Sequence, residues 1–250
     1  MMDKIISGKR RWYATRVYNG VLDRVRTRPV DAVVGDLPAL NEIKQRAARR
    51  SDISDHLPTM FVETLRARPR LIVELGVRRG ESTFVFERVA RLTGATIVSC
   101  DLNDCSGTSA YEKRHFVQGD DVEFARRFPE WCRERGIRPE IDVLFIDTSH
   151  FYDHTVAEID AWFPFLSEQG KVILHDTNLT YTYFRKDGSI GFAMECERGV
   201  IRALEGFFGK NYDETRDFID VQGGWLIQHW AKCCGLTILD RIPLKEGAGR

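Results

Sequence analysis

The chain has 250 residues, in which 37 lysines and arginines balance 37 aspartates and glutamates. Because the formal net charge is zero, no overall field draws the protein onto nucleic acid or an anionic membrane, and we expect neither as a partner. No stretch approaches the roughly 20 apolar residues of a membrane span, and the first residues lack the apolar centre of a signal peptide, so we expect a cytoplasmic protein.

The N-terminal part of the chain is rich in arginine and has helical patterns, of which residues 39–50 are the clearest. A chain of this length fits a single α/β unit, so we do not expect a second domain here. We predict instead that residues 1–62 form a helical cap over the sheet or the active site. Residues 63–250 are then predicted to form the catalytic domain.

From residue 69 onward, short apolar runs alternate with amphipathic segments, which is the pattern of helices wrapped around a mostly parallel sheet. The predicted strands are residues 70–75, 96–100, 115–118, 141–146 and 171–174. The predicted helices between them are residues 82–92, 122–135 and 154–166. The pattern therefore predicts a doubly wound, Rossmann-like α/β fold.

The end of the chain changes character. After a predicted helix at residues 197–208, three strands are predicted in direct succession, at residues 217–221, 224–228 and 236–240. Strands that follow one another without a long helix pair in antiparallel fashion, and Gly223 and Gly224 supply a flexible turn between the first two. We therefore expect an antiparallel C-terminal edge on a mostly parallel sheet.

The first predicted strand leads into the loop Glu74-Leu-Gly76-Val-Arg-Arg-Gly80. Gly76 can adopt backbone angles closed to other residues and lets a ligand approach the main chain, while Gly80 lets the next helix pack closely. The Gly-x-Gly-x-x-Gly pattern of dinucleotide folds is absent, and Glu74 would repel a phosphate. A cationic ligand without phosphate, such as S-adenosylmethionine, suits the loop better. A plain strand-to-helix turn is the alternative.

Further acids follow the second and third predicted strands. Asp101 ends the second strand, where a carboxylate can accept hydrogen bonds from both hydroxyls of a ribose. After the third strand, Asp120 can accept from an adenine amino group, and Asp121 can cap the next helix. Cofactor contact and helix capping stay equally open for this pair.

Several of these motifs, taken in order, resemble those of class I S-adenosylmethionine-dependent methyltransferases. The matching motifs are Val73-Glu74-Leu75-Gly76, Asp101, Gly119-Asp120, Leu144-Phe-Ile-Asp147 and Val172-Ile-Leu-His-Asp176. Within that superfamily, Asp147-Thr-Ser-His150 and His175-Asp176 are similar to motifs of metal-dependent sugar O-methyltransferases of antibiotic biosynthesis. These include macrocin, mycinamicin and rhamnosyl O-methyltransferases and the cephalosporin-hydroxylase-like group. With S-adenosylmethionine as cofactor, the expected binding residues are Glu74, Gly76, Gly80, Ser82, Asp101, Asp120 and Asp147.

A metal site is expected after the fourth and fifth strands. Asp147 and Asp176 each end an apolar run, so neighbouring strands bring them to the same edge of the sheet, where a divalent cation can neutralise both. Oxygen-rich surroundings favour magnesium, calcium or manganese over zinc. His175 is the candidate third ligand, although the similar sugar enzymes have an acid there, and a histidine favours manganese or other transition metals over magnesium. The alternative is that both aspartates are structural. We expect magnesium or manganese.

His150 is the expected catalytic residue. A sugar hydroxyl has a pKa far above neutrality, so methylation of its oxygen needs a base, and histidine, with an ordinary pKa of about 6.5, suits that task. The histidine at this spacing is the proposed base in the similar family, which implies the same role for His150. A solvated loop histidine is the alternative.

These features predict an S-adenosylmethionine-dependent O-methyltransferase that modifies a hydroxyl of a small molecule. The expected acceptor is a deoxysugar, linked to a nucleotide or carried by a glycosylated natural product, and we expect a homo-oligomer. A catechol-type metal-dependent methyltransferase and a non-catalytic subunit that binds the cofactor are the alternatives. An NAD-dependent dehydrogenase is disfavoured by the missing glycines. Residues 181–198 mix aromatic, basic and glycine residues, which suggests a substrate lid, although ordinary loop composition explains them almost as well.

Overall fold

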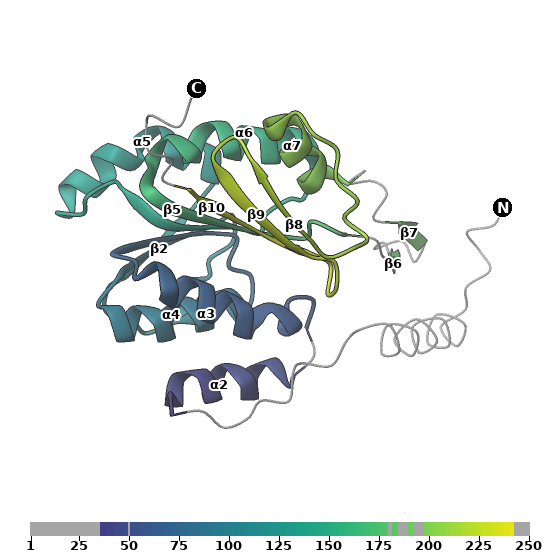
Figure 1. The fold of residues 1–250 in the computed structure, drawn as a ribbon. Coiled ribbons are helices and arrows are strands. Elements are labelled where there is room, and N and C mark those ends of the chain that lie inside the picture. Colours follow the sequence, from purple (N-terminus) through teal and green to yellow (C-terminus); the bar gives the residue numbers. More distant parts are fainter. Residues whose placement is uncertain (1–35, 50, 180–181, 185–189, 193–197, 243–250) are drawn as a thin grey trace.

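The computed structural model describes residues 36–49, 51–179, 182–184, 190–192 and 198–242. One large sheet runs through the middle of the molecule (Figure 1), and its strands are β1 (Leu71–Leu75), β2 (Thr96–Asp101), β3 (Arg114–Gln118), β4 (Ile141–Ile146), β5 (Leu166–His175), β8 (Phe218–Gln222), β9 (Trp225–Trp230) and β10 (Leu236–Arg241). Their spatial order is β3-β2-β1-β4-β5-β10-β9-β8. Two further strands, β6 (Thr182–Phe184) and β7 (Ile190–Phe192), form a separate two-stranded sheet.

Helices cover both faces of the large sheet (Figure 1). One face carries α2 (Pro38–Ala47), α3 (Leu57–Ala67) and α4 (Glu81–Thr93), and the other carries α5 (Asp121–Glu134), α6 (Tyr152–Trp162) and α7 (Gly199–Phe208). Each layer has its own apolar core, because side chains along each buried strand alternate between the two faces. Single-turn helices lie at Ser54–His56, Ser106–Thr108 and Phe163–Phe165.

The sheet confirms the predicted architecture. β1 pairs in parallel with β2 and β4, and β4 pairs in parallel with β5. β10 is antiparallel to β5 and to β9, and β8 is antiparallel to β9, so the C-terminal edge is antiparallel as predicted. The strand order reverses between β1 and β4, and ligands in such sheets bind beyond the carboxyl ends of the strands at that point.

Most element boundaries lie within a few residues of the prediction, and the largest differences lie around Pro164. The helix predicted at residues 154–166 begins at Tyr152 and ends at Trp162, and β5 begins at Leu166 rather than at residue 171. Pro164 accounts for the earlier end, because proline has no backbone N–H to donate in a helix interior. The chain continues through the single-turn helix Phe163–Phe165 into β5. The helix predicted from residue 197 begins at Gly199, and residue 197 itself lies outside the described residues.

The N-terminal helices share the core of the sheet. Ile43 of α2 and Phe61 of α3 are fully buried in the same apolar cluster as Ile72 of β1. The boundary predicted between residues 62 and 63 lies inside α3, and residues 1–35 of the predicted cap lie outside the described residues. A capping role for residues 1–62 stays a prediction. Among the described helices, none is long and apolar enough to cross a membrane.

Candidate active site at the carboxyl ends of the strands

The loop after β1 is held by the backbones of its two neighbouring strands. The Gly76 N–H donates to the Cys100 carbonyl at 2.9 Å, and the Asp147 N–H donates to the Leu75 carbonyl at 2.9 Å. Gly76 has φ of +84°, and a Cβ added to it would lie 2.0 Å from the Asp147 carbonyl oxygen. Gly76 is therefore required by the close approach of the Asp147 backbone, which the sequence did not reveal.

Gly80 has a similar double constraint at the start of α4. It is the N-cap residue, with φ of +76°, and an added Cβ would lie 2.9 Å from the Thr108 Cβ. The predicted close packing at this glycine is thus with the connection between β2 and β3. Both glycines are thus required by contacts within the protein itself.

Glu74 does not face the loop surface, where a cationic ligand was expected to meet it. Its side chain is completely buried, and the carboxylate accepts hydrogen bonds from the hydroxyls of Ser82 at 2.7 Å, Thr83 at 2.8 Å and Ser99 at 2.6 Å. Burial raises the pKa of Glu74, against the opposing effect of these donors. This buried network fastens the first turn of α4 to β1 and β2, and contact of Glu74 and Ser82 with a cofactor stays a prediction.

Asp101 closes the loop from the end of β2. One carboxylate oxygen, Oδ2, accepts from the backbone N–H groups of Val77 at 2.9 Å and Arg78 at 3.0 Å. The other, Oδ1, accepts from the Asn103 backbone at 2.8 Å. Partial burial alone would raise the pKa of Asp101, but these backbone donors outweigh it and hold the pKa below its ordinary value. Asp101 therefore stays ionised at the sheet edge where a ribose was expected.

The capping role falls to Asp120 and not to Asp121. Asp120 is the N-cap of α5, and its Oδ1 accepts from the Glu123 backbone N–H at 2.8 Å. Asp121 is buried in the first turn, and its Oδ1 accepts from His154 Nε2 at 3.0 Å. The hydrogen bond to Asp121 raises the pKa of His154. The cap predicted at Asp121 is thus made by Asp120, and contact of Asp120 with the cofactor stays a prediction.

Glu158 of α6 adds a buried acid to the Asp121–His154 pair. It is completely buried, and its Oε1 accepts from the Thr148 hydroxyl at 2.7 Å. Burial and the nearby Asp121 charge raise the pKa of Glu158 well above its ordinary value. This network connects the start of α5 with the loop after β4, and nothing in the sequence pattern had suggested it.

The predicted metal ligands come together at the ends of β4 and β5. His175 Nδ1 lies 3.3 Å from Asp147 Oδ1 and 3.5 Å from Asp176 Oδ2. Asp147 and the pair His175–Asp176 thus form a compact group of one nitrogen and two carboxylates. His175 and Asp176 are buried, whereas 27% of the Asp147 side chain is exposed, so the group has access to solvent on one side.

The imidazole of His175 and the carboxylate of Asp176 shift each other's pKa toward the charged form. Burial alone would lower the pKa of His175, but the carboxylates of Asp176 and Asp147 outweigh it and raise the pKa well above its ordinary value. Burial alone would raise the pKa of Asp176, but His175 outweighs it and lowers the pKa. In the described part of the chain, Asp176 Oδ1 is a buried atom without a hydrogen-bond partner.

His150 lies beside this group. Its Nε2 is 3.1 Å from Asp176 Oδ2, and 24% of its side chain is exposed. The backbone of His150 is left-handed, with φ of +63°, and its carbonyl oxygen would lie 2.2 Å from a Cβ added to Gly199. The first residue of α7 therefore fixes the loop that presents His150.

Sequence reasoning missed the histidine and the turn that support His175 from behind. His56 packs edge-on against the His175 ring, with centroids 6.0 Å apart, and burial together with the nearby His175 lowers the pKa of His56 to about 3. The Cys233 carbonyl oxygen lies 3.3 Å from His175 Nε2. His56 is 119 positions before His175 in the chain, and only the fold brings the two together.

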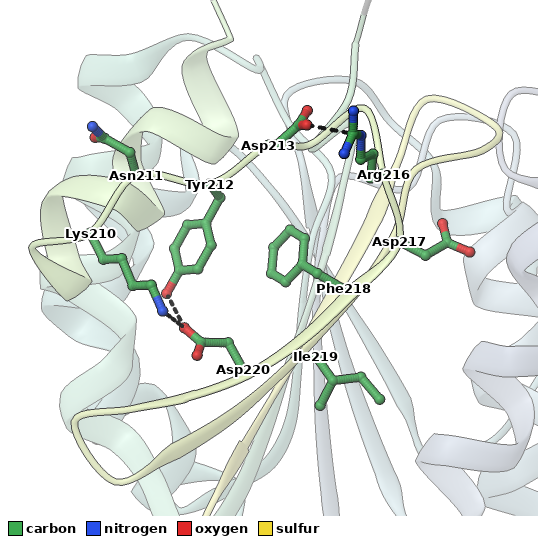
Figure 2. Close-up of a pocket in the computed structure, with 9 residues that line it drawn as sticks. All are labelled: Lys210, Asn211, Tyr212, Asp213, Arg216, Asp217, Phe218, Ile219 and Asp220. Carbon is green, nitrogen blue, oxygen red and sulfur yellow. Dashed lines mark hydrogen bonds and ion pairs between the residues drawn. The ribbon is translucent and has the colours of Figure 1, made fainter.

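A hollow of about 330 Å³ lies elsewhere, along β8 and the connection that precedes it. Figure 2 shows Lys210 and Tyr212 directed toward Asp220, at 2.7 and 3.3 Å, and the Tyr212 ring stacked on Phe218. Its arginine, Arg216, pairs with an aspartate of the same hollow. Lys210 and Arg216 already have acidic partners, and the hollow shares no residue with the group formed by Asp147, His175 and Asp176. We therefore assign the hollow no catalytic role.

The chain is similar in sequence to a known domain family and to one curated protein. Residues 73–177 match the family model described as a methyltransferase domain. A curated relative from Sinorhizobium fredii, named only as the uncharacterised protein y4gI, is 30% identical over 125 residues. That match covers 45% of this chain and 14% of the relative, so the chain spans a small part of the relative's length.

Solved methyltransferase structures share the fold at low identity. The MycE methyltransferase of the mycinamycin pathway, in complex with Mg, SAH and mycinamycin VI, matches with a TM-score of 0.55 and 19% identity. The match covers 86% of this chain and 57% of MycE. A putative caffeoyl-CoA O-methyltransferase from Staphylococcus aureus matches with a TM-score of 0.53 and 12% identity, over 92% of this chain and 98% of the other. These likenesses concern the fold.

Proposed function

We propose that this chain, whose residues 73–177 form a methyltransferase domain on a methyltransferase fold, transfers the methyl group of S-adenosylmethionine to a hydroxyl oxygen of a small molecule. The observation that most supports this is the convergence of Asp147, His150, His175 and Asp176 beside the Gly76 loop. A base and a cation-binding group then lie at the sheet edge where the cofactor of such a fold binds.

The cofactor is proposed to lie across the loop after β1. Asp101, ionised and only partly buried, is the proposed partner of the ribose hydroxyls. Asp120 keeps a second carboxylate oxygen beyond the one used in capping, and we propose that it accepts from the adenine amino group. Gly76 and Gly80 shape the loop, and Glu74 with Ser82 acts on the cofactor indirectly by holding α4 in place.

A divalent cation is proposed at Asp147, His175 and Asp176. The residues fit such an ion, because two carboxylates and one imidazole nitrogen face one another and Asp176 Oδ1 is a buried acceptor with no partner in the described part of the chain. When bound, a cation supplies positive charge that orients an acceptor hydroxyl and makes it more acidic. The chain's own contribution is to hold the ligands on the rigid ends of β4 and β5.

His150 is proposed to take the proton of the acceptor hydroxyl at a ring nitrogen. The nearby Asp176 carboxylate, 3.1 Å from Nε2, stabilises the imidazolium that results. The acceptor oxygen forms a bond to the methyl carbon as the bond from carbon to sulfur breaks, and the sulfur keeps that electron pair. The products are the methyl ether, S-adenosylhomocysteine and a proton on His150.

The acceptor class is proposed from the resemblance of the motifs around Asp147 and Asp176. We propose a deoxysugar, carried by a nucleotide or by a glycosylated natural product, and a MycE structure with the same fold is a complex with mycinamycin VI. A catechol-type acceptor is the second candidate, because a putative caffeoyl-CoA O-methyltransferase also shares the fold. A homo-oligomer stays an expectation.

Methyl transfer can be tested with S-adenosylmethionine labelled in its methyl group. We expect label in at least one member of a panel of nucleotide deoxysugars and glycosylated macrolides, and little in catechols. His150→Ala should lower turnover by about 100-fold or more, since general-base help typically contributes that much. His115→Ala, on β3, is the control. Full turnover by His150→Ala with unchanged pH dependence would remove the base assignment, and undiminished turnover in EDTA would remove the cation.

A further inference from the structure

The imidazole of His175 has a defined hydrogen-bonding direction. Its Nε2 lies 3.3 Å from the Cys233 carbonyl oxygen, and a carbonyl can only accept, so Nε2 carries the hydrogen. In the neutral ring, Nδ1 then presents a bare lone pair. That lone pair is directed at Asp147 Oδ1 and Asp176 Oδ2, at 3.3 and 3.5 Å.

His175 Nδ1 and one carboxylate oxygen from each of Asp147 and Asp176 therefore lie close enough together to share one cation. A proton on His175 Nδ1 would supply one positive charge against the two negative charges of Asp147 and Asp176. A divalent cation would supply two, and His175 with the two aspartates would hold it. The buried Asp176 Oδ1, which lacks a hydrogen-bond partner among the described residues, also favours the divalent ion.

A strained turn supplies the carbonyl that directs His175. Cys233, Cys234 and Gly235 are consecutive left-handed residues, with φ of 51°, 66° and 84°. This conformation is costly for the two cysteines. It is held by Asn178, whose backbone N–H donates to the Cys234 carbonyl at 2.7 Å and whose side chain donates to the Ala231 carbonyl at 2.7 Å.

The same turn directs a second histidine. The Lys232 carbonyl accepts from His56 Nε2 at 2.8 Å, and the His56 ring packs edge-on against that of His175. His175 is thus oriented from behind by a carbonyl and packed by a neutral ring. Metal-binding histidines are commonly fixed in this way, with the far nitrogen donating to a backbone carbonyl.

From this geometry we infer that the Asp147–His175–Asp176 site selects a transition-metal ion over magnesium. The inference rests on the cation site of the proposed function, but not on methyl transfer. Mg²⁺ demands near-ideal octahedral oxygen ligation, whereas an imidazole nitrogen suits later transition metals. Affinity is expected to rise from Mg²⁺ through Mn²⁺ to Co²⁺, and Zn²⁺ is also expected to bind more tightly than Mg²⁺.

The test is calorimetric titration of the metal-free full-length protein with MgCl₂, MnCl₂, CoCl₂ and ZnCl₂. We expect Co²⁺ to bind at least about tenfold more tightly than Mg²⁺. His175→Gln should weaken Co²⁺ binding by roughly tenfold or more and leave Mg²⁺ binding nearly unchanged. His175→Glu, which offers oxygen in place of nitrogen, should shift the preference toward Mg²⁺. The visible absorption of bound Co²⁺, which reports nitrogen ligation, should change in both variants.

His115→Gln is the matched control, because this histidine of β3 packs on Trp131 and is not part of the site. It should leave the ranking of metals unchanged. The wild-type ranking needs no variant to fold, so equal or tighter binding of Mg²⁺ than of Co²⁺ overturns the inference. Absence of metal binding, as expected of a protonated His175, overturns it as well.

Titration of the same preparation with S-adenosylhomocysteine separates this inference from the proposed function. Binding of S-adenosylhomocysteine together with a magnesium preference would overturn only the metal inference. A transition-metal preference without S-adenosylhomocysteine binding would support the metal inference and contradict the proposed function.

Discussion

At the scale of single residues, the acids near the strand ends differ in pKa because they differ in surroundings. Backbone N–H groups hold the pKa of Asp101 low, whereas burial raises the pKa values of Glu74 and Glu158. Glu74 is compensated by three hydroxyl donors, and Glu158 by one. Glu74 and Glu158 therefore fasten elements to one another, whereas Asp101 stays the proposed ligand contact.

Glu158 provides a prediction on stability against pH. Its folded-state pKa lies above its ordinary value, because of burial and the Asp121 charge, so its protonation favours the folded state. The stability that it contributes is complete below its ordinary pKa and is lost as the pH rises through the folded-state pKa. Glu158→Gln mimics the protonated acid and should remove this loss. Urea denaturation from pH 5 to pH 9 measures it.

The expected result is that Glu158→Gln gains stability relative to the wild type as the pH rises. Glu123→Gln, in the exposed first turn of α5, is the control and should follow the wild-type curve. A constant difference between Glu158→Gln and the wild type across the pH range would contradict a raised pKa at Glu158.

Gly76 provides a second prediction at this scale. An alanine there would meet the Asp147 carbonyl at 2.0 Å in addition to the cost of its left-handed backbone, and no change of rotamer can relieve a clash between Cβ and backbone. We expect Gly76→Ala to lower the free energy of unfolding by more than about 4 kcal/mol. Gly209→Ala, at φ of +64° with nothing within 4 Å, should cost only about 1 kcal/mol. Equal costs in chemical denaturation would show that the Asp147 contact is unimportant.

From the sequence, the position of the candidate site was more predictable than the surroundings of its individual residues. Asp147 and Asp176 were predictable, because each follows an apolar run and parallel strands end at one edge. The burial of the Glu74 side chain was not predictable. The sequence alone does not show which face of the sheet this side chain takes, and its hydroxyl partners come from other elements. His56 was equally hidden, since its contact with His175 depends on how α3 docks.

At the scale of elements, a buried lysine attaches α3 to the sheet. Lys171 of β5 is only 5% exposed, and its Nζ lies 2.8 Å from Glu63 of α3 and 2.6 Å from Asp240 of β10. Lys171 lowers the pKa of Glu63 against the opposing effect of partial burial. This cluster joins a helix of the predicted cap to both strands beneath it.

Removal of this lysine should be costly. Lys171→Met leaves two carboxylates without their shared cation, and we expect a loss of about 2 kcal/mol, less than for a fully buried pair because Asp240 reaches water. Arg66→Ala is the matched control, because Arg66 pairs with the same Glu63 but is largely exposed, and it should change stability little. If both variants have the same unfolding midpoint in urea, Lys171 does not anchor α3.

Most elements were predictable, because the central strands are short apolar runs buried on both faces and the helices have one consistent buried side. The boundary at Trp162 was not, since the amphipathic pattern continues past the point where Pro164 ends the helix. The position of β10 between β5 and β9 was also beyond the sequence, because antiparallel pairing alone does not give the spatial order.

At the scale of the whole molecule, both layers meet the sheet edge where the site lies. α3 and the adjoining turn at Ser54–His56 bring His56 behind His175, and α7 of the opposite layer fixes the His150 loop through Gly199. The site is therefore a product of the complete fold. The neutral charge balance of the chain agrees with a small-molecule acceptor rather than a polyanion.

The Gly76 loop and Asp101 are proposed to bind S-adenosylmethionine, and calorimetry with S-adenosylhomocysteine tests this binding most directly. We expect one molecule bound per chain, with affinity lowered about tenfold or more by Asp101→Asn, since a charged acceptor is lost. Asp213→Asn, in the hollow along β8, should bind like the wild type. Absence of binding, or binding that Asp101→Asn leaves unchanged, would contradict the account.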